Sequence, residues 1–186
     1  ILVDGTPVTG PTPDRAMVFQ SYHLFPWLSV RENVAFGLVE EGVPVDRRTE
    51  RVHEMLDLVG LADRADAYPA ELSGGMNQRV GLARALAVDP GMLLMDEPFG
   101  SVDLQTRRRL QRELLDIWRR MEKTVLFVTH DIEEAVLLSD RVLVLTGTPG
   151  RVCDNVTIEL SRPRDRTDDD FLGYVDTLLN QVETAI

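Results

Sequence analysis

Residues 72–79 read Leu-Ser-Gly-Gly-Met-Asn-Gln-Arg, and residues 92–97 read Met-Leu-Leu-Met-Asp-Glu. The first stretch places a hydroxyl and two glycines ahead of a helical segment, where the unpaired N–H groups of a helix start suit an anion. The second stretch is a short apolar run, typical of a buried parallel strand, that ends in two carboxylates. Together they predict a site in which one surface binds phosphate and another activates water.

Strand and helix patterns alternate on the C-terminal side of these stretches. Apolar runs and helical periodicities follow one another at 92–95, 103–121, 125–128, 131–138 and 142–145. This alternation predicts parallel βαβ units and therefore an α/β fold. Residues 151–160 are predicted as edge strands, and a last helix is expected after the carboxylates of residues 168–170.

A small helical subdomain is predicted on the N-terminal side. Two short strands, at 1–3 and 16–19, are separated by a turn-rich segment. Ser29 and Glu32 have the spacing of a capping box, so a helix is expected from there to about residue 41. Further helical segments are predicted at 46–59, at 62–67 and, capped by Ser73, up to residue 87.

The composition limits the possible functions. The 186 residues can bury one sizeable core, and the net charge of −11 argues against nucleic acid as the main partner. A single cysteine, Cys153, cannot form an internal disulfide and favours a reducing setting. No apolar run approaches the roughly 18 residues of a membrane span. The chain begins inside a strand-like run without methionine, so we expect it to be cut at its N-terminus.

Three side chains are expected at the ends of predicted strands. Asp96 could hold Mg²⁺ and Glu97 could orient or deprotonate a water, since parallel sheets bind ligands at the carboxyl ends of their strands. His130 follows the next strand and could donate to a phosphate oxygen. Taken singly, each motif has a simpler explanation. Asp96 and Glu97 could form an acidic turn after a strand, and His130 could be a structural histidine. Ser73 could cap a helix after the Gly-Gly turn of Gly74 and Gly75.

In combination, these residues resemble the ATP-hydrolysing subunit of ABC transporters. Five motifs stand in the family's order. Gln20 matches the Q-loop glutamine, residues 72–78 match the signature motif, and residues 92–96 match Walker B, with Glu97 as the catalytic glutamate. Residues 101–103 match the D-loop, and His130 matches the switch histidine. Asn77 and Val102 are mild departures, since arginine and alanine are common at these positions.

The resemblance implies a P-loop NTPase-like (RecA-like) parallel sheet core with an inserted helical subdomain, the N-terminal part of the core being absent. Residues 1–20 would be a remnant of N-terminal strands, 21–87 the Q-loop region, helical subdomain and signature helix, 88–160 the core, and 161–186 a linker and helix. The implied cofactors are ATP and Mg²⁺. The implied roles are catalysis for Glu97, His130 and Gln20, metal binding for Asp96 and Gln20, and nucleotide binding for Ser73, Gly74, Gly75, Gln78 and Asp103.

A finer resemblance links the chain to the nitrate/sulfonate/taurine importers, through residues 24–34, 147–151 and 161–166. In that family the loop after the glutamine docks on a membrane permease, so Phe25 and Trp27 would be contact residues; alternatively, they pack the helical subdomain. The other implied partners are a second copy in a head-to-tail dimer and, indirectly, a solute-binding protein. The implied location is the cytoplasmic face of the membrane, and no nucleic acid partner is expected.

The phosphate-loop motif G-x-x-x-x-G-K-[ST] does not occur in the 186 residues, whose one lysine is Lys123. We therefore expect this chain by itself to bind ATP weakly or not at all, and its sheet to be under-filled. Three readings remain open: a truncated transport ATPase, a non-catalytic module that docks a permease, and an ABC ATPase of DNA repair or translation. The acidic charge and the aromatic loop count against the third.

Overall fold

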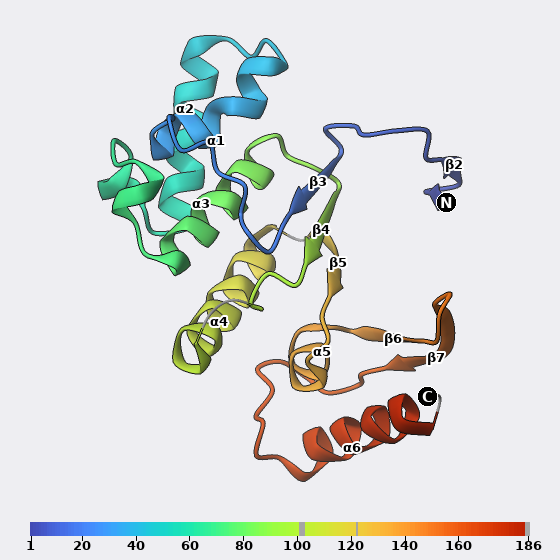
Figure 1. Cartoon of the computed structure of the whole chain (residues 1–186). Helices are drawn as coiled ribbons and strands as arrows, with labels where there is room; N and C mark the ends of the chain where they lie inside the picture. The colour runs from blue at the N-terminus through green and yellow to red at the C-terminus, as the bar shows by residue number, and fades with distance from the viewer. Residues whose placement is uncertain (101–102, 122, 185–186) are drawn as a thin grey trace. The chain divides into compact units, whose positions relative to one another are not determined.

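A parallel sheet of three strands organises the first of two units, Ile1–Val128 and Thr129–Ile186. The computed structural model describes residues 1–100, 103–121 and 123–184. The strands are β3 (Arg15–Val18), β4 (Met92–Asp96) and β5 (Thr124–Val128), with β4 in the centre (Figure 1). Val18 pairs with Met95, and Asp96 pairs with Val128. The α/β class and the parallel pairing predicted for these segments are confirmed.

Three helices of the first unit form the predicted helical subdomain. They are α1 (Val30–Glu40), α2 (Val45–Leu58) and α3 (Gly74–Ala87), and they pack against one another. The capping box is present, because Ser29 Oγ accepts from Glu32 N at 3.3 Å and Ser29 N donates to Glu32 Oε2 at 2.7 Å. Two 3₁₀ turns, Ala62–Arg64 and Pro69–Glu71, connect α2 to α3.

The core of the first unit lies where α3 and α4 (Leu104–Met121) cover one face of the sheet. Val18 and Met95 on the strands are buried, as are Leu110 and Ile117 of α4. The other face of β5 differs, because Leu126 and Val128 are about half exposed there. Parallel strands are usually covered on both faces, so these half-exposed side chains distinguish β5 from a fully buried strand.

A short hairpin precedes the sheet and was not expected from the sequence. Strands β1 (Leu2–Val3) and β2 (Thr6–Pro7) pair antiparallel. Asp4 and Gly5 connect them with φ values of 48° and 75°. Two consecutive residues with positive φ are typical of a type I′ turn, and Asp-Gly is its preferred sequence, so the signal was present.

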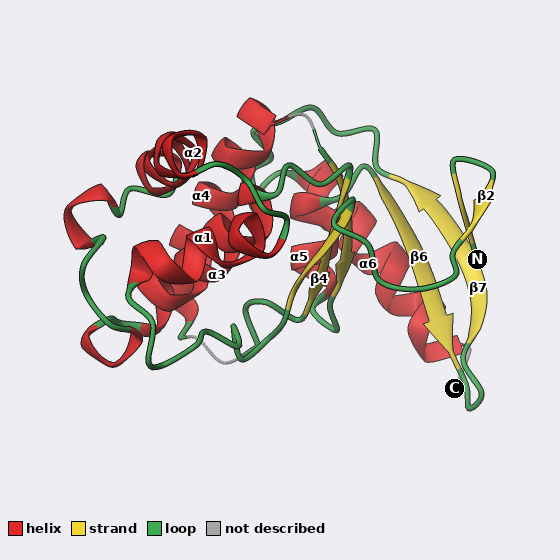
Figure 2. Cartoon of the chain, turned by 90° about the horizontal axis from the view of Figure 1, so that it is seen from above, coloured by secondary structure: helices red, strands yellow, loops and turns green. Residues whose placement is uncertain are grey.

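The second unit contains α5 (Ile132–Leu138), β6 (Arg141–Thr146), β7 (Arg151–Thr157) and α6 (Asp169–Thr184). The prediction that residues 142–145 continue the parallel series was wrong, since β6 pairs antiparallel with β7 through a short turn (Figure 2). α6 packs against β6 and α5, and the core of this unit contains Val136, Val144, Phe171 and Leu178. No helix among the described residues is long and apolar enough to cross a membrane.

Candidate functional site

Two predicted site residues lie at one edge of the parallel sheet. Gln20 follows β3 by two residues, and Asp96 is the last residue of β4. Because the strands are parallel and Val18 pairs with Met95, the two carboxyl ends lie side by side. Both side chains are exposed. This edge therefore offers an amide and a carboxylate where open parallel sheets bind their ligands.

Glu97 has a backbone conformation that is rare for a residue with a side chain. Its φ is 43°, although Pro98 follows and normally imposes an extended conformation on the residue before it. Its N–H donates to Val128 O at 2.9 Å, and its carbonyl accepts from Gly100 N at 3.1 Å. Such strain costs about 1–3 kcal/mol and is found mainly at functional sites, where the surrounding fold enforces it.

Gly100 brings the predicted catalytic residues together. A Cβ at this position would lie 2.8 Å from Gln20 Nε2 and 3.5 Å from Glu97 Oε2. The absence of a side chain therefore lets the glutamine amide and the glutamate carboxylate approach the same small space. Gln20, Asp96 and Glu97 thus lie together at this edge of the sheet.

The start of α3 is built as the sequence predicted. Ser73 is the N-cap, and its Oγ accepts from Met76 N at 3.3 Å. Ser73 and Gly74 are exposed, so a ligand could reach the first N–H groups of the helix, which have no partner within it. Gly75 is buried, because α3 packs closely against α4 at this point.

Arg109 of α4 is a cation beside this helix start that sequence reasoning missed. Its Nη2 would lie 3.5 Å from a Cβ at Gly75, and its Nε is 3.7 Å from a carboxylate oxygen of Glu113. A guanidinium here adds positive charge to the partial charge of the helix N-terminus, which favours an anion. The arginine run 107–109 was the available signal in the sequence.

Gln78 is buried, unlike Ser73 at the exposed start of the same helix. Its side chain is 5% exposed and faces the core, where it lines a cavity of about 20 Å³ with Glu113 and apolar residues of the sheet and α4. This volume has room for about one water. Within the described residues, Gln78 Oε1 has no hydrogen-bond partner.

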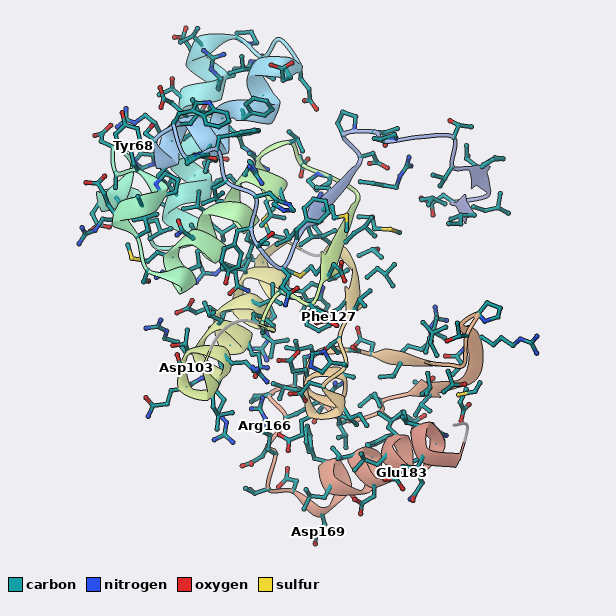
Figure 3. The ribbon with its side chains drawn as sticks, viewed as in Figure 1. Tyr68, Asp103, Phe127, Arg166, Asp169 and Glu183 are labelled. Carbon is teal, nitrogen blue, oxygen red and sulfur yellow. The ribbon has the colours of Figure 1, made fainter. Side chains whose placement is uncertain are left out.

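Asp103, labelled in Figure 3, directly precedes the first residue of α4 and caps this helix. Its Oδ1 accepts from Thr106 N at 3.1 Å and Gln105 N at 3.0 Å. Hydrogen bonds from Thr106, with a smaller contribution from Gln105, hold the pKa of the Asp103 carboxyl below its ordinary value. The other two residues of the predicted D-loop, Ser101 and Val102, lie outside the described residues.

His130 lies in the second unit, just before α5, and is exposed. The residues around it are well fixed: Thr129 Oγ1 donates to Glu134 Oε2 at 2.9 Å and accepts from Asp131 N at 3.0 Å. Asp131 caps α5 by accepting from Glu134 N at 3.1 Å. The predicted contact of His130 with a phosphate stays a prediction.

Phe25 and Trp27 differ in their surroundings. Phe25 is half-buried and lies between two aromatic rings, with centroid distances of 4.4 Å to Phe36 and 5.6 Å to Trp27. Trp27 is 70% exposed. Phe25 therefore packs the helical subdomain, while Trp27 is available to a partner.

The donor set at the sheet edge fits a magnesium ion held mainly by a nucleotide. No group of three or more His, Cys, Asp or Glu residues in the described part of the chain could hold a metal by itself. Mg²⁺ in nucleotide enzymes is bound by one or two protein oxygens together with phosphates. The exposed Asp96 carboxylate and the Gln20 amide oxygen match that requirement.

Comparison with known proteins identifies the family. A model of the ABC transporter family matches residues 1–100. An uncharacterised ABC transporter ATP-binding protein of Methanocaldococcus jannaschii is 54% identical over 186 residues, and the match covers 100% of this chain and 70% of that protein. The nitrate import ATP-binding protein NrtD of Synechocystis is 49% identical over 187 residues, and the match covers 96% of this chain and 70% of NrtD. The taurine import ATP-binding protein TauB of Burkholderia thailandensis is 51% identical over 162 residues, and the match covers 87% of this chain and 62% of TauB.

A solved structure agrees with this result. CbiO1 of Clostridium perfringens, part of the ABC transporter complex CbiONQ, superimposes with a TM-score of 0.76 at 28% identity, covering 85% of this chain and 65% of that one. The chain belongs to the ABC transporter family and is an ATP-binding subunit of it. The resemblance drawn from the five motifs and the P-loop NTPase-like fold class are confirmed.

Proposed function

We propose that this chain is part of the ATP-hydrolysing subunit of an importer for a small solute, of the nitrate/sulfonate/taurine type. The observation that carries the proposal is the convergence of Gln20 and Glu97 on Gly100, beside Asp96 at the end of β4. The names of the nitrate and taurine relatives support the import branch. The chain spans 62–70% of the length of these relatives, so the activity of the whole protein is part of the proposal.

In this proposal the sheet edge carries the hydrolytic chemistry. Glu97 accepts the hydrogen bond of the attacking water and orients it toward the γ-phosphate of ATP, as a general base does. Asp96 and Gln20 would hold Mg²⁺, which neutralises charge on the phosphates. His130 donates to a γ-phosphate oxygen.

The exposed start of α3 serves a second copy of the protein. Ser73, Gly74 and Gly75 clamp the γ-phosphate of a nucleotide held mainly by the other subunit of a head-to-tail dimer. Asp103 stands near the same interface, and Gln78 supports α3 from within rather than touching the nucleotide. This arrangement uses the exposed N–H groups and the neighbouring Arg109 as an anion site.

In this proposal the exposed Trp27 contacts a membrane permease, with Phe25 packed behind it in the helical subdomain, and the protein would lie at the cytoplasmic face of the membrane. A solute-binding protein would be an indirect partner. In the resembled family, other subunits select the solute.

Replacing Glu97 tests the proposal. In protein expressed from the complete coding region, Glu97→Gln should lower ATP turnover at least 100-fold, the lower range for a general base, while ATP-dependent dimerisation persists. Glu50→Gln, which changes an exposed glutamate on α2 in the same way, should leave turnover unchanged. Normal turnover in Glu97→Gln would refute the assignment.

A second candidate is a non-catalytic module that docks a permease. The 186 residues contain no G-x-x-x-x-G-K-[ST]. For this reason a polypeptide of these residues alone should show no Mg²⁺-dependent ATPase above background. An in-frame phosphate-loop motif upstream of Ile1 in the coding region would support the importer ATPase, and a start codon at that point would support the module.

A further inference from the structure

The loop that follows Gln20 has a strained backbone conformation that contacts with neighbouring elements must stabilise. Tyr22 and His23 have φ values of 59° and 42°, in the left-handed region that side chains disfavour. Two tight turns accompany them, with Tyr22 N donating to Phe19 O at 3.0 Å and His23 N to Ser21 O at 2.7 Å. A short strained loop of this kind persists only where neighbouring elements fix it.

Arg84 of α3 supplies that support. Its Nη2 donates to Tyr22 O at 2.9 Å, and its Nη1 donates to His23 O at 2.8 Å. The guanidinium carbon also lies 5.4 Å from the centroid of the Phe25 ring, in cation–π geometry. One side chain therefore binds both strained residues and the aromatic residue that follows them.

α3 approaches the loop closely at the same place. A Cβ at Gly81 would lie 3.6 Å from the Cβ and the carbonyl oxygen of Tyr22. Gly81 and Arg84 are three residues apart, so they share one face of the helix. Ser73 and Gly74 lie at the other end of α3, roughly 15 Å away at 1.5 Å per residue.

The far side of the loop is attached to α1. Asn33 is fully buried, accepts from Phe25 N at 2.8 Å, and donates to Leu28 O at 3.0 Å. The loop is thus suspended between two helices, and α3 is the one that begins at the predicted nucleotide contact.

We propose that Arg84 is a positioning residue that locks the loop of residues 19–28 to α3, so that a movement of the signature end of the helix is passed to Phe25 and Trp27. This inference rests on the proposed function, in which the start of α3 grips ATP and Trp27 contacts the permease. The fork geometry of arginine is essential, because two carbonyl oxygens must be bound at once by a planar group.

Arg84→Lys tests the proposal, because it keeps the charge but loses the fork. Arg51→Lys is the matched control: Arg51 of α2 also binds two carbonyls of α3, with Nε 3.1 Å from Ala87 O and Nη2 3.0 Å from Leu86 O, but it does not touch the loop. The first measurement is amide exchange of residues 20–25 without nucleotide. Arg84→Lys should accelerate it about tenfold, as expected for the loss of one net hydrogen bond, and Arg51→Lys should not.

The second measurement follows Trp27 emission on addition of Mg-ATP, in a Trp118→Phe background that removes the other tryptophan. The protein expressed from its complete coding region should show a change that Arg84→Lys reduces by more than half and Arg51→Lys preserves. The inference would be overturned if amide exchange were unchanged in Arg84→Lys, or if it changed equally in Arg84→Lys and Arg51→Lys. It would also be overturned if Arg84→Lys kept the full change in Trp27 emission on addition of Mg-ATP. Absence of ATP hydrolysis in the unsubstituted protein would refute the proposed function instead, and the exchange comparison would still decide the role of Arg84.

Discussion

Replacing Asn33 by alanine should destabilise the first unit more than an ordinary polar substitution. Asn33 is fully buried, and its Oδ1 accepts from Phe25 N at 2.8 Å. Its Nδ2 faces three carbonyl oxygens, of Leu28 and Ser29 at 3.0 Å and of Phe25 at 3.1 Å. One side chain therefore organises the whole turn that leads into α1.

The expected loss in the free energy of unfolding follows from these contacts. Alanine would leave the Phe25 N–H without its acceptor, at a cost of about 1–3 kcal/mol for an unpaired buried donor. The two lost N–H donors would add about 0.5–1.5 kcal/mol each, less where water reaches the carbonyls. Since such terms do not add fully, we expect the free energy of unfolding to fall by about 2–4 kcal/mol.

Urea unfolding followed by Trp118 emission, in a Trp27→Phe background, measures this change. Trp118 lies in the same unit, and its Nε1 donates to Lys123 O at 2.9 Å, away from the substituted turn. Asn77→Ala is the control, because Asn77 donates one hydrogen bond, to Pro69 O at 3.1 Å, and should cost about 0.5–1.5 kcal/mol. A loss in Asn33→Ala no larger than in Asn77→Ala would refute the reasoning.

A charged replacement gives a second check on the same contacts. In Asn33→Asp, the ionised carboxylate would face three carbonyl oxygens without water, so burial and repulsion would raise the pKa of this carboxyl. A raised pKa in the folded state means that stability is lost as the pH increases. Asn33→Asp should therefore be less stable than Asn33→Ala at pH 7 and should recover as the pH falls toward 4. A pH-independent difference would contradict the buried geometry.

Two further predictions concern the caps. Because hydrogen bonds lower the pKa of Asp103, its contribution to stability is present above about pH 3.9, the ordinary value, and is lost as the pH falls through the folded pKa. Asp103→Asn, which accepts but does not titrate, should lack this acid-dependent fall in the urea midpoint, and an identical pH profile would contradict the cap. Arg164 donates through Nη1 to Val136 O and Ser139 O, both at 2.6 Å, so Arg164→Lys should destabilise the second unit by about 2–3 kcal/mol, measured by amide exchange in α5 and α6. The exposed Arg151→Lys should change nothing, and equal exchange in both variants would argue against this role of Arg164.

The features that the sequence predicted correctly depend on neighbours within a few residues. The capping box of Ser29 and Glu32 and the Ser73 cap are local hydrogen-bond patterns, so their spacing alone identifies them. The ends of β3 and β4 were predicted to within one residue, because an apolar run followed by polar residues marks the carboxyl end of a buried strand. The positions of Asp96 and Glu97 after a buried strand could therefore be predicted from residue types and order.

Long-range pairing was not predictable in the same way. The apolar run in β6 looks like that of a parallel strand, yet β6 pairs with β7, because the turn after Thr146 reverses the chain with Gly147 at a φ of 77°. Arg84 illustrates the same limit. Nothing in its helical neighbourhood indicates that its partners are the carbonyls of Tyr22 and His23, about 60 residues earlier.

Glu97 shows why a site needs both kinds of information. Its position after a buried strand follows from the sequence, but the direction of its side chain depends on a positive φ that Pro98 opposes. That conformation is maintained by the hydrogen bond from Glu97 N to Val128 O, which exists only because β4 and β5 are parallel and in register at Asp96. Gly100 then keeps the space beside the carboxylate free for Gln20. The orientation of the proposed catalytic residue is thus a property of the sheet as a whole, and a substitution that shifts the register of β5 should impair the site without touching any residue in it.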